Sequence, residues 1–113
     1  MNIIDDVKFL GLLRVRFLAI TKVDRGVPRE IMTWATDSIK YIDVMTEDLW
    51  KAISTGGTGV DWKGHIEAID VIVAQFRWMM AYPEYKQAIR EEIAGCMTVR
   101  ETLVELEEGN YET

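Results

Sequence analysis

The sequence is poor in the residues that cross-link a fold. It has one cysteine, Cys96, and one histidine, His65, in 113 residues. A lone cysteine cannot form an intramolecular disulfide, and no Cys/His cluster has the spacing of zinc ligands. The balance of 49% hydrophobic and 28% charged residues is typical of a folded globular protein. At this length we expect one domain over residues 1–113.

Long apolar runs are also missing. The longest, residues 9–20, contains Arg14 and Arg16, whereas a bilayer crossing needs roughly 20 apolar residues. Asp5 and Asp6 precede this run, where a signal peptide would carry basic residues. We therefore expect a cytoplasmic protein that does not interact with membranes.

A basic patch is the third feature that the sequence lacks. Residues 1–90 hold twelve Lys/Arg and twelve Asp/Glu, whereas residues 91–113 hold seven acids against Arg100, so the net charge of −6 is concentrated at one end. Nucleic-acid binding normally requires a basic face. We therefore expect no direct nucleic-acid binding, and a protein partner with a basic surface instead.

Helical periodicity is clearest after Pro28, which suits a first helical position. Apolar residues recur on one face of the following segment, and charged residues occupy the opposite face. The pattern predicts one helix over about 29–54, roughly 39 Å long at 1.5 Å per residue. In the alternative, Thr46 caps a second helix, which would place a kink near this residue. Its apolar face comprises Ile31, Trp34, Ala35, Ile39, Ile42, Met45, Leu49, Ala52 and Ile53.

Three more helices are expected toward the C-terminus. Asp61 can cap a helix over 62–81, and Pro83 can open one that runs through Met97. The segment Thr98-Val-Arg-Glu101 has the spacing of a capping box, which predicts a short last helix over 99–108. Residues 109–113 are a candidate disordered tail.

The N-terminal third fits two structures. Residues 3–23 can form a helix that is apolar on most sides, but residues 13–17 alternate like a strand and residues 24–26 could form a hairpin turn. We prefer the helix, because a lone hairpin would need partner strands that the rest of the chain does not offer. The prediction is an all-α single-domain bundle of four to five helices.

Two carboxylates stand three residues apart in the third predicted helix. Glu67 and Asp70 share one helical face and could hold Mg²⁺. The stretch Glu67-Ala-Ile-Asp70 resembles half of the metal site of the all-α nucleoside triphosphate pyrophosphatases, in which a Glu-x-x-Asp helix faces a Glu-Glu-x-x-Glu helix. This resemblance implies a Mg²⁺-dependent enzyme, with Asp43 and Glu47 as further ligands. However, the long helix lacks the second motif, and both acids face away from the main apolar arc, so we predict a solvated polar stripe.

Other residues of catalytic potential have no visible partner. His65 falls on the apolar side of its helix, where we expect it at the edge of the core with a backbone hydrogen bond. Cys96 shares the helical phase of Ile89 and Ile93, which predicts a core position. The loop 56–64 lacks the Gly-Lys-Ser/Thr order of a phosphate-binding loop. We therefore predict no catalytic residues.

Surface aromatic and acidic residues are the remaining candidates. Trp78 lies outside the main apolar arc, so it is either covered by a second layer or exposed, and exposed tryptophan is enriched in interfaces. Glu101, Glu105 and Glu108 share one helical face. These four residues are the predicted contacts for a protein partner.

The sequence therefore favours a non-catalytic interaction protein that acts as an adaptor or inhibitor without a cofactor. Small acidic all-α proteins of phages and other mobile elements include such proteins, although this is an analogy of size and composition only. The first alternative is the Mg²⁺-dependent pyrophosphatase-like enzyme. The second is a structural or chaperone subunit of a homo-oligomer, in which Trp78 and Val71 pack against another copy of the chain.

Overall fold

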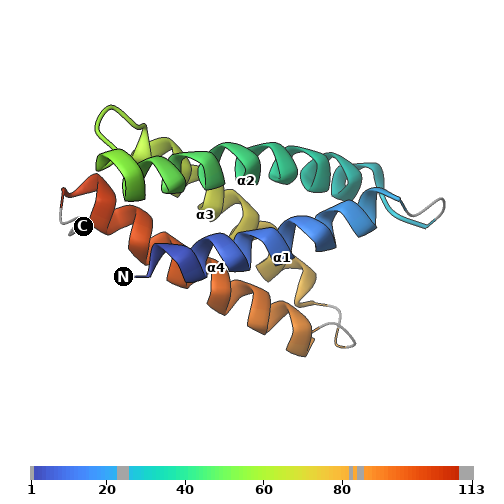
Figure 1. The fold of residues 1–113 in the computed structure, drawn as a ribbon. Coiled ribbons are helices and arrows are strands. Elements are labelled where there is room, and N and C mark those ends of the chain that lie inside the picture. The colour runs from blue at the N-terminus through green and yellow to red at the C-terminus, as the bar shows by residue number, and fades with distance from the viewer. Residues whose placement is uncertain (1, 23–25, 82, 84–85, 110–113) are drawn as a thin grey trace.

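The chain folds into an up-down-up-down helical bundle. The computed structural model describes residues 2–22, 26–81, 83 and 86–109, which form helices without any strand. The helices are α1 (Ile3–Thr21), α2 (Arg29–Thr55), α3 (Trp62–Met79) and α4 (Lys86–Glu107). The start of α1 and the end of α4 lie at the same end of the bundle (Figure 1). The predicted all-α fold with one long helix is confirmed.

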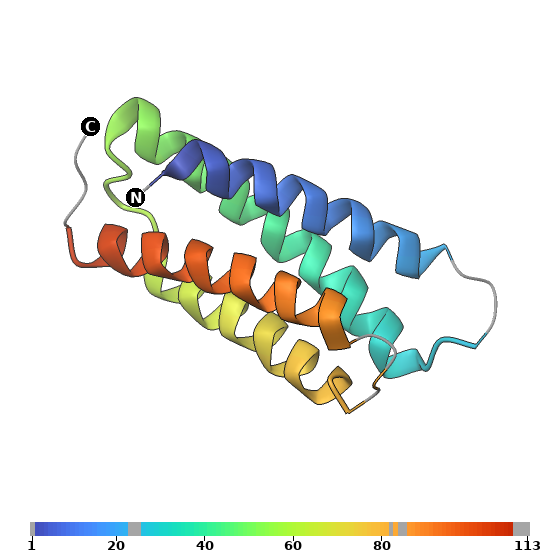
Figure 2. The same ribbon diagram turned by 90° about the horizontal axis from the view of Figure 1, so that it is seen from below.

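The four helices are arranged as two antiparallel pairs. Helices α1 and α2 pack along their length, as do α3 and α4, whereas α2 touches α3 and α1 touches α4 over less of their length. Figure 2 shows the two pairs side by side. None of these helices is both long and apolar enough to cross a membrane, as judged over the residues that the structure describes. The seam between α2 and α3 is thus one of the two loosely packed seams of the bundle.

The ends of α2 and α3 follow local signals in the sequence. Helix α2 starts directly after Pro28 and ends at Gly56, whose φ of 81° is a left-handed conformation that favours glycine. Asp61 caps α3, because its Oδ1 accepts a hydrogen bond from the Gly64 N–H at 3.0 Å. Helix α2 is continuous through Thr46, so the alternative of a second helix cap there is wrong.

The predicted break within α4 is also wrong. Thr98 Oγ1 donates to the Ala94 carbonyl at 3.1 Å, a bond inside the helix, and it does not cap a new one. Val99 and Leu103 are fully buried and continue the face of Cys96, so tertiary packing holds the helix straight through the capping-box sequence. In the N-terminal third, the preferred helix is confirmed up to Thr21. The predicted turn residues 24 and 25 and the tail residues 110–113 lie outside the described part of the chain.

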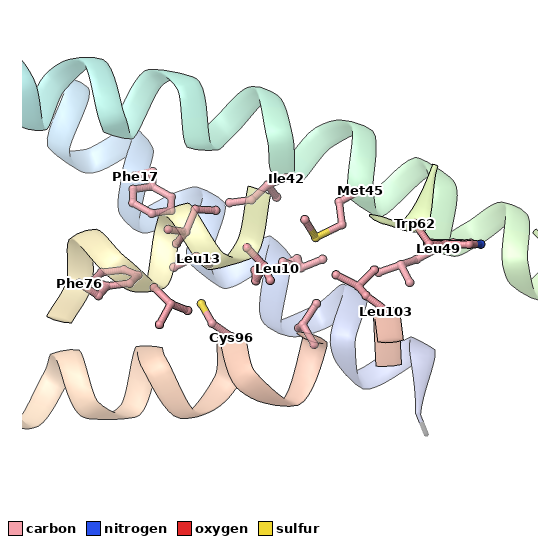
Figure 3. Packing of buried hydrophobic residues seen from close by; sticks show 14 of the residues in the cluster. Leu10, Leu13, Phe17, Ile42, Met45, Leu49, Trp62, Phe76, Cys96 and Leu103 are labelled. Carbon is pink, nitrogen blue, oxygen red and sulfur yellow. The ribbon is translucent and has the colours of Figure 1, made fainter. Parts of the chain in front are cut away.

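The core lies between the two helix pairs (Figure 3). Phe17, Trp34 and Phe76 form an aromatic cluster, in which the Trp34 ring meets Phe17 and Phe76 edge-on at centroid distances of 4.8 and 5.1 Å. Cys96 is fully buried, as predicted, and burial raises the pKa of its thiol to about 12. The thiol is therefore protonated at neutral pH and serves as a packing group.

The contact between α1 and α4 is fixed by polar side chains and by a close approach. Thr102 Oγ1 donates to the Asp6 carboxylate at 2.5 Å, and both residues are buried. Arg16 forms an ion pair with Glu92 further along the same seam. A Cβ atom at Gly95 would lie 2.1 Å from the Phe9 ring, so the absence of a side chain permits this helix spacing.

Candidate functional site

The four carboxylates of the alternative reading, a metal site, do not converge. Asp70 accepts a hydrogen bond from Arg100 Nε of α4 at 2.7 Å, and Asp43 accepts one from Arg14 Nε of α1 at 2.6 Å. Among the described residues, no group of three or more His, Cys, Asp or Glu side chains could hold a metal ion. Asp70 and Asp43 therefore serve as ion-pair partners between helices.

The remaining two of these carboxylates differ in their surroundings. Glu47 Oε1 lies 3.8 Å from Lys51 Nζ of the same helix, an exposed pair of the kind that contributes little to stability. Glu67 is exposed and lines a hollow between α2 and α3. Glu67 thus lies on a concave surface.

His65 lies at the edge of the core, as predicted, but its side-chain partner is a carboxylate. Its Nε2 lies 2.6 Å from Oδ2 of Asp48 in α2, and the other oxygen of Asp48 lies 3.5 Å from Lys51 Nζ. The Trp62 ring packs against the imidazole. Because Asp48 precedes His65 by 17 positions, the neighbours of His65 in sequence gave no sign of it. The pair joins α2 to α3 near the loop that connects them.

Away from this contact, the seam between α2 and α3 opens into a groove. A central cavity of about 500 Å³ adjoins a second of about 380 Å³, with which it shares Glu30 and Gln75. It also adjoins a third of about 210 Å³, with which it shares Tyr41 and Val71. We call the three together the α2–α3 groove. It follows the seam from Pro28 to Glu67 and is built from both helix pairs.

The walls of the α2–α3 groove expose large apolar side chains. Tyr41 is 43% exposed, Val71 56% and Trp78 58%. Exposed aromatic residues gathered around a concavity mark binding surfaces, whereas apolar residues scattered singly do not. The predicted binding residue Trp78 thus belongs to a larger surface.

The groove is acidic. Its lining includes the carboxylates of Glu30, Asp37 and Glu67 and the guanidinium of Arg29. The charged groups that line it therefore sum to a negative charge, which favours a cationic ligand.

The acidic face of α4 lies apart from Trp78. Glu101 and Glu108 are exposed and Glu105 is half-buried. Arg100 contacts Asp70, and Trp78 lies eight residues beyond Asp70, about 12 Å further along α3. Because α4 runs antiparallel to α3, the three glutamates extend in the opposite direction. The four residues predicted to bind a partner thus belong to two separate surfaces.

Sequence reasoning missed the contribution of α2 to the groove. Glu30, Trp34, Asp37 and Tyr41 follow one another at intervals of three or four residues, which places them on one helical stripe. This spacing was visible in the sequence. However, the opposite wall comes from α3, and only the tertiary structure shows that the two helices leave space between them.

Comparisons with known proteins add no further constraint. No protein-family model matches the chain, and no curated protein or solved structure is significantly similar to it. A proposal for its function therefore rests on the geometry and chemistry of its own side chains.

Proposed function

We propose that this protein is a non-catalytic interaction module, an adaptor or inhibitor, that binds a protein with a basic surface in the α2–α3 groove. The observation that supports this proposal is the combination of exposed apolar side chains and excess carboxylates along one groove. Aromatic side chains at the centre of an interface supply a large share of the binding energy. Carboxylates around them attract a basic partner and reject acidic ones.

The two acidic surfaces have different roles in this proposal. Glu30 and Asp37 lie in the groove, where they would contact cationic side chains of the partner directly. Glu101 and Glu108 lie on α4, outside the groove. Exposed charges act over a screening length of roughly 8 to 10 Å at physiological salt, so the α4 glutamates would mainly accelerate association. Their contribution would weaken as salt increases.

The test uses two valines that differ in position and little else. Val71 lines the groove, whereas Val15 lies in α1 outside it and is 62% exposed. Tagged wild-type protein, Val71→Lys and Val15→Lys are used to capture partners from lysate of the native host, with elution by a salt gradient and identification by mass spectrometry. We expect one stoichiometric basic protein to bind wild type and Val15→Lys and to be lost from Val71→Lys, because the lysine at position 71 repels a basic surface.

Several results would contradict the proposal. Retention of the partner by Val71→Lys would exclude the groove as the binding site, provided that circular dichroism shows all three proteins folded. Capture of an acidic partner, or of no partner at any salt concentration, would remove the basis for a basic ligand.

Charge reversal of Glu101, Glu105 and Glu108 to lysine is expected to reduce the association rate and its salt dependence while leaving the fold intact.

A further inference from the structure

The two walls of the α2–α3 groove follow the same spacing. On α3 the lining residues recur at alternating intervals of four and three positions: Gly64, Ala68, Val71, Gln75 and Trp78. On α2 they recur in the same way from Glu30 to Tyr41. An average interval of 3.5 residues is the spacing at which one helix packs along another. At 1.5 Å per residue, the stripe on α3 is about 21 Å long.

The walls of the groove offer side chains for contact but no strand edge. Both walls are α-helices, and the described residues contain no strand. An extended segment normally binds by adding a strand to the edge of a sheet, because its backbone N–H and C=O groups need partners. A helix pairs these groups internally and contacts its partner through side chains alone. The occupant that the groove favours is therefore a helix.

The acids of the groove are available to cationic side chains. Within the part of the chain that the structure describes, Glu30, Asp37 and Glu67 form no ion pair, although Arg29 also lines the groove. Glu30 and Asp37 are seven residues apart, about 10.5 Å along α2. Two lysine or arginine residues that are seven positions apart on a helix repeat at the same distance. The α2 wall thus matches such a pair of cations in both charge and spacing.

The apolar contacts repeat at the same distance on the opposite wall. Val71 and Trp78 are both exposed and are also seven residues apart. Gly64 and Ala68 lie nearer the loop on the same stripe, where their small side chains leave room for a larger residue of a ligand. Helices that bind in grooves use apolar anchors at intervals of three and four residues. The α3 wall is therefore suited to the apolar face of such a helix.

We propose that the α2–α3 groove binds an amphipathic basic helix of about four turns, which packs as a fifth helix against α2 and α3. Its apolar residues, at positions i, i+3, i+7 and i+10, contact Val71 and Trp78. Its lysine or arginine side chains, seven positions apart, contact Glu30 and Asp37. This inference rests on the proposed function and specifies which kind of basic segment the partner must carry.

The test compares two peptides of identical composition and charge. In acetyl-LKKLAKALKKLAKA-amide the leucines fall on one helical face. The isomer acetyl-LKLKLKLKAKAKAA-amide has alternating leucines, which a helix divides between two faces. A peptide of this length is largely unfolded on its own. Each peptide carries fluorescein and is titrated with wild type, Val71→Lys and Val15→Lys. Fluorescence anisotropy measures binding, and circular dichroism of mixtures with the unlabelled peptide measures helix formation.

We expect the first peptide to bind wild type at least about tenfold more tightly than its isomer, because burial of one leucine side chain is worth roughly this factor. Helix content should increase on mixing with the first peptide only. Val71→Lys should weaken binding of the first peptide by about tenfold or more, since it replaces an apolar contact by a like charge. Val15→Lys adds the same charge outside the groove and should change the affinity by less than about twofold, because salt screens exposed charges.

The other outcomes would overturn the inference in distinguishable ways. If the two peptides bind equally and Val71→Lys weakens both, the groove binds basic segments without requiring a helix, and the proposed function stands. Binding of the first peptide without an increase in helix content leads to the same conclusion. If the first peptide binds Val71→Lys as tightly as wild type, its site lies outside the groove. If neither peptide binds at millimolar concentration, recognition of a basic helix is refuted, and the lysate capture with Val71→Lys decides the proposed function separately.

Discussion

The close approach of α1 and α4 at Gly95 predicts opposite effects for two glycine-to-alanine substitutions. Gly95 and Gly11 both lie inside helices, where alanine is more favourable than glycine by about 1 kcal/mol. A Cβ at Gly11 would meet nothing within 4 Å, whereas a Cβ at Gly95 would lie 2.1 Å from the Phe9 ring. The two positions thus share the gain in helix propensity and differ in the cost of packing.

The magnitudes follow from these two terms. Gly11→Ala is expected to raise the free energy of unfolding by about 1 kcal/mol, from helix propensity alone. At Gly95 the Phe9 ring must move aside, and overpacking of this kind costs about 1 to 3 kcal/mol. Gly95→Ala should therefore be neutral to about 2 kcal/mol destabilising, and the two variants should differ by about 1 to 3 kcal/mol.

Urea denaturation followed by circular dichroism measures both variants. For a chain of this size, 1 kcal/mol corresponds to roughly 4 °C in Tm, so thermal melts provide a second reading. If the Phe9 ring is the cause, Gly95→Ala should become stabilising by about 1 kcal/mol in a Phe9→Ala background. Equal stabilisation by Gly11→Ala and Gly95→Ala in the wild-type background would refute the reasoning.

Three further predictions concern buried groups. Burial raises the pKa of Asp6, and this effect outweighs that of the hydrogen bond from Thr102. The folded state therefore keeps a proton that the unfolded chain releases near pH 4. The free energy of unfolding consequently falls as the pH rises through this range. Asp6→Asn should therefore be more stable than wild type at pH 7, and urea denaturation at pH 3 should show the gain lost; a gain that persists there contradicts the assignment to ionisation. Ser38→Ala removes a buried hydroxyl that has no hydrogen-bond partner among the described residues, so it should raise the free energy of unfolding by about 1 kcal/mol; a lower free energy of unfolding in urea denaturation would instead show that the hydroxyl makes a hydrogen bond. Cys96 should resist a thiol reagent at pH 8 in the folded protein and react fully in urea, and rapid labelling without urea would show that the core opens there.

Helix boundaries could be predicted best where the residues that start and end a helix lie within that helix or next to it. Helix α2 could be predicted to within a residue, because a proline, a glycine and an uninterrupted apolar phase define it without reference to other helices. Helix α4 could not, because a capping-box sequence and a mid-helix threonine look alike until the burial of Val99 and Leu103 is known.

The site depended on contacts between helices, which periodicity does not encode. Trp78 was identified because it lies outside the apolar arc of α3, a property of one helix. The partner of His65 and the ion pairs of Asp70 and Asp43 come from other helices, 17 to 30 positions away in sequence. The groove itself arises because α2 and α3 pack less closely than the helices within each pair.

The pairing of helices that are adjacent in sequence has a consequence for folding. Each of the two helix pairs can form around its own short connection before the other pair has formed, so the entropy cost of loop closure is small. We therefore expect folding within milliseconds. The junction of the two hairpins would then form last and reopen first. Amide hydrogen exchange should consequently be faster along the α2–α3 seam than along α1–α2, so a ligand could enter the groove by separating two preformed hairpins without unfolding either one.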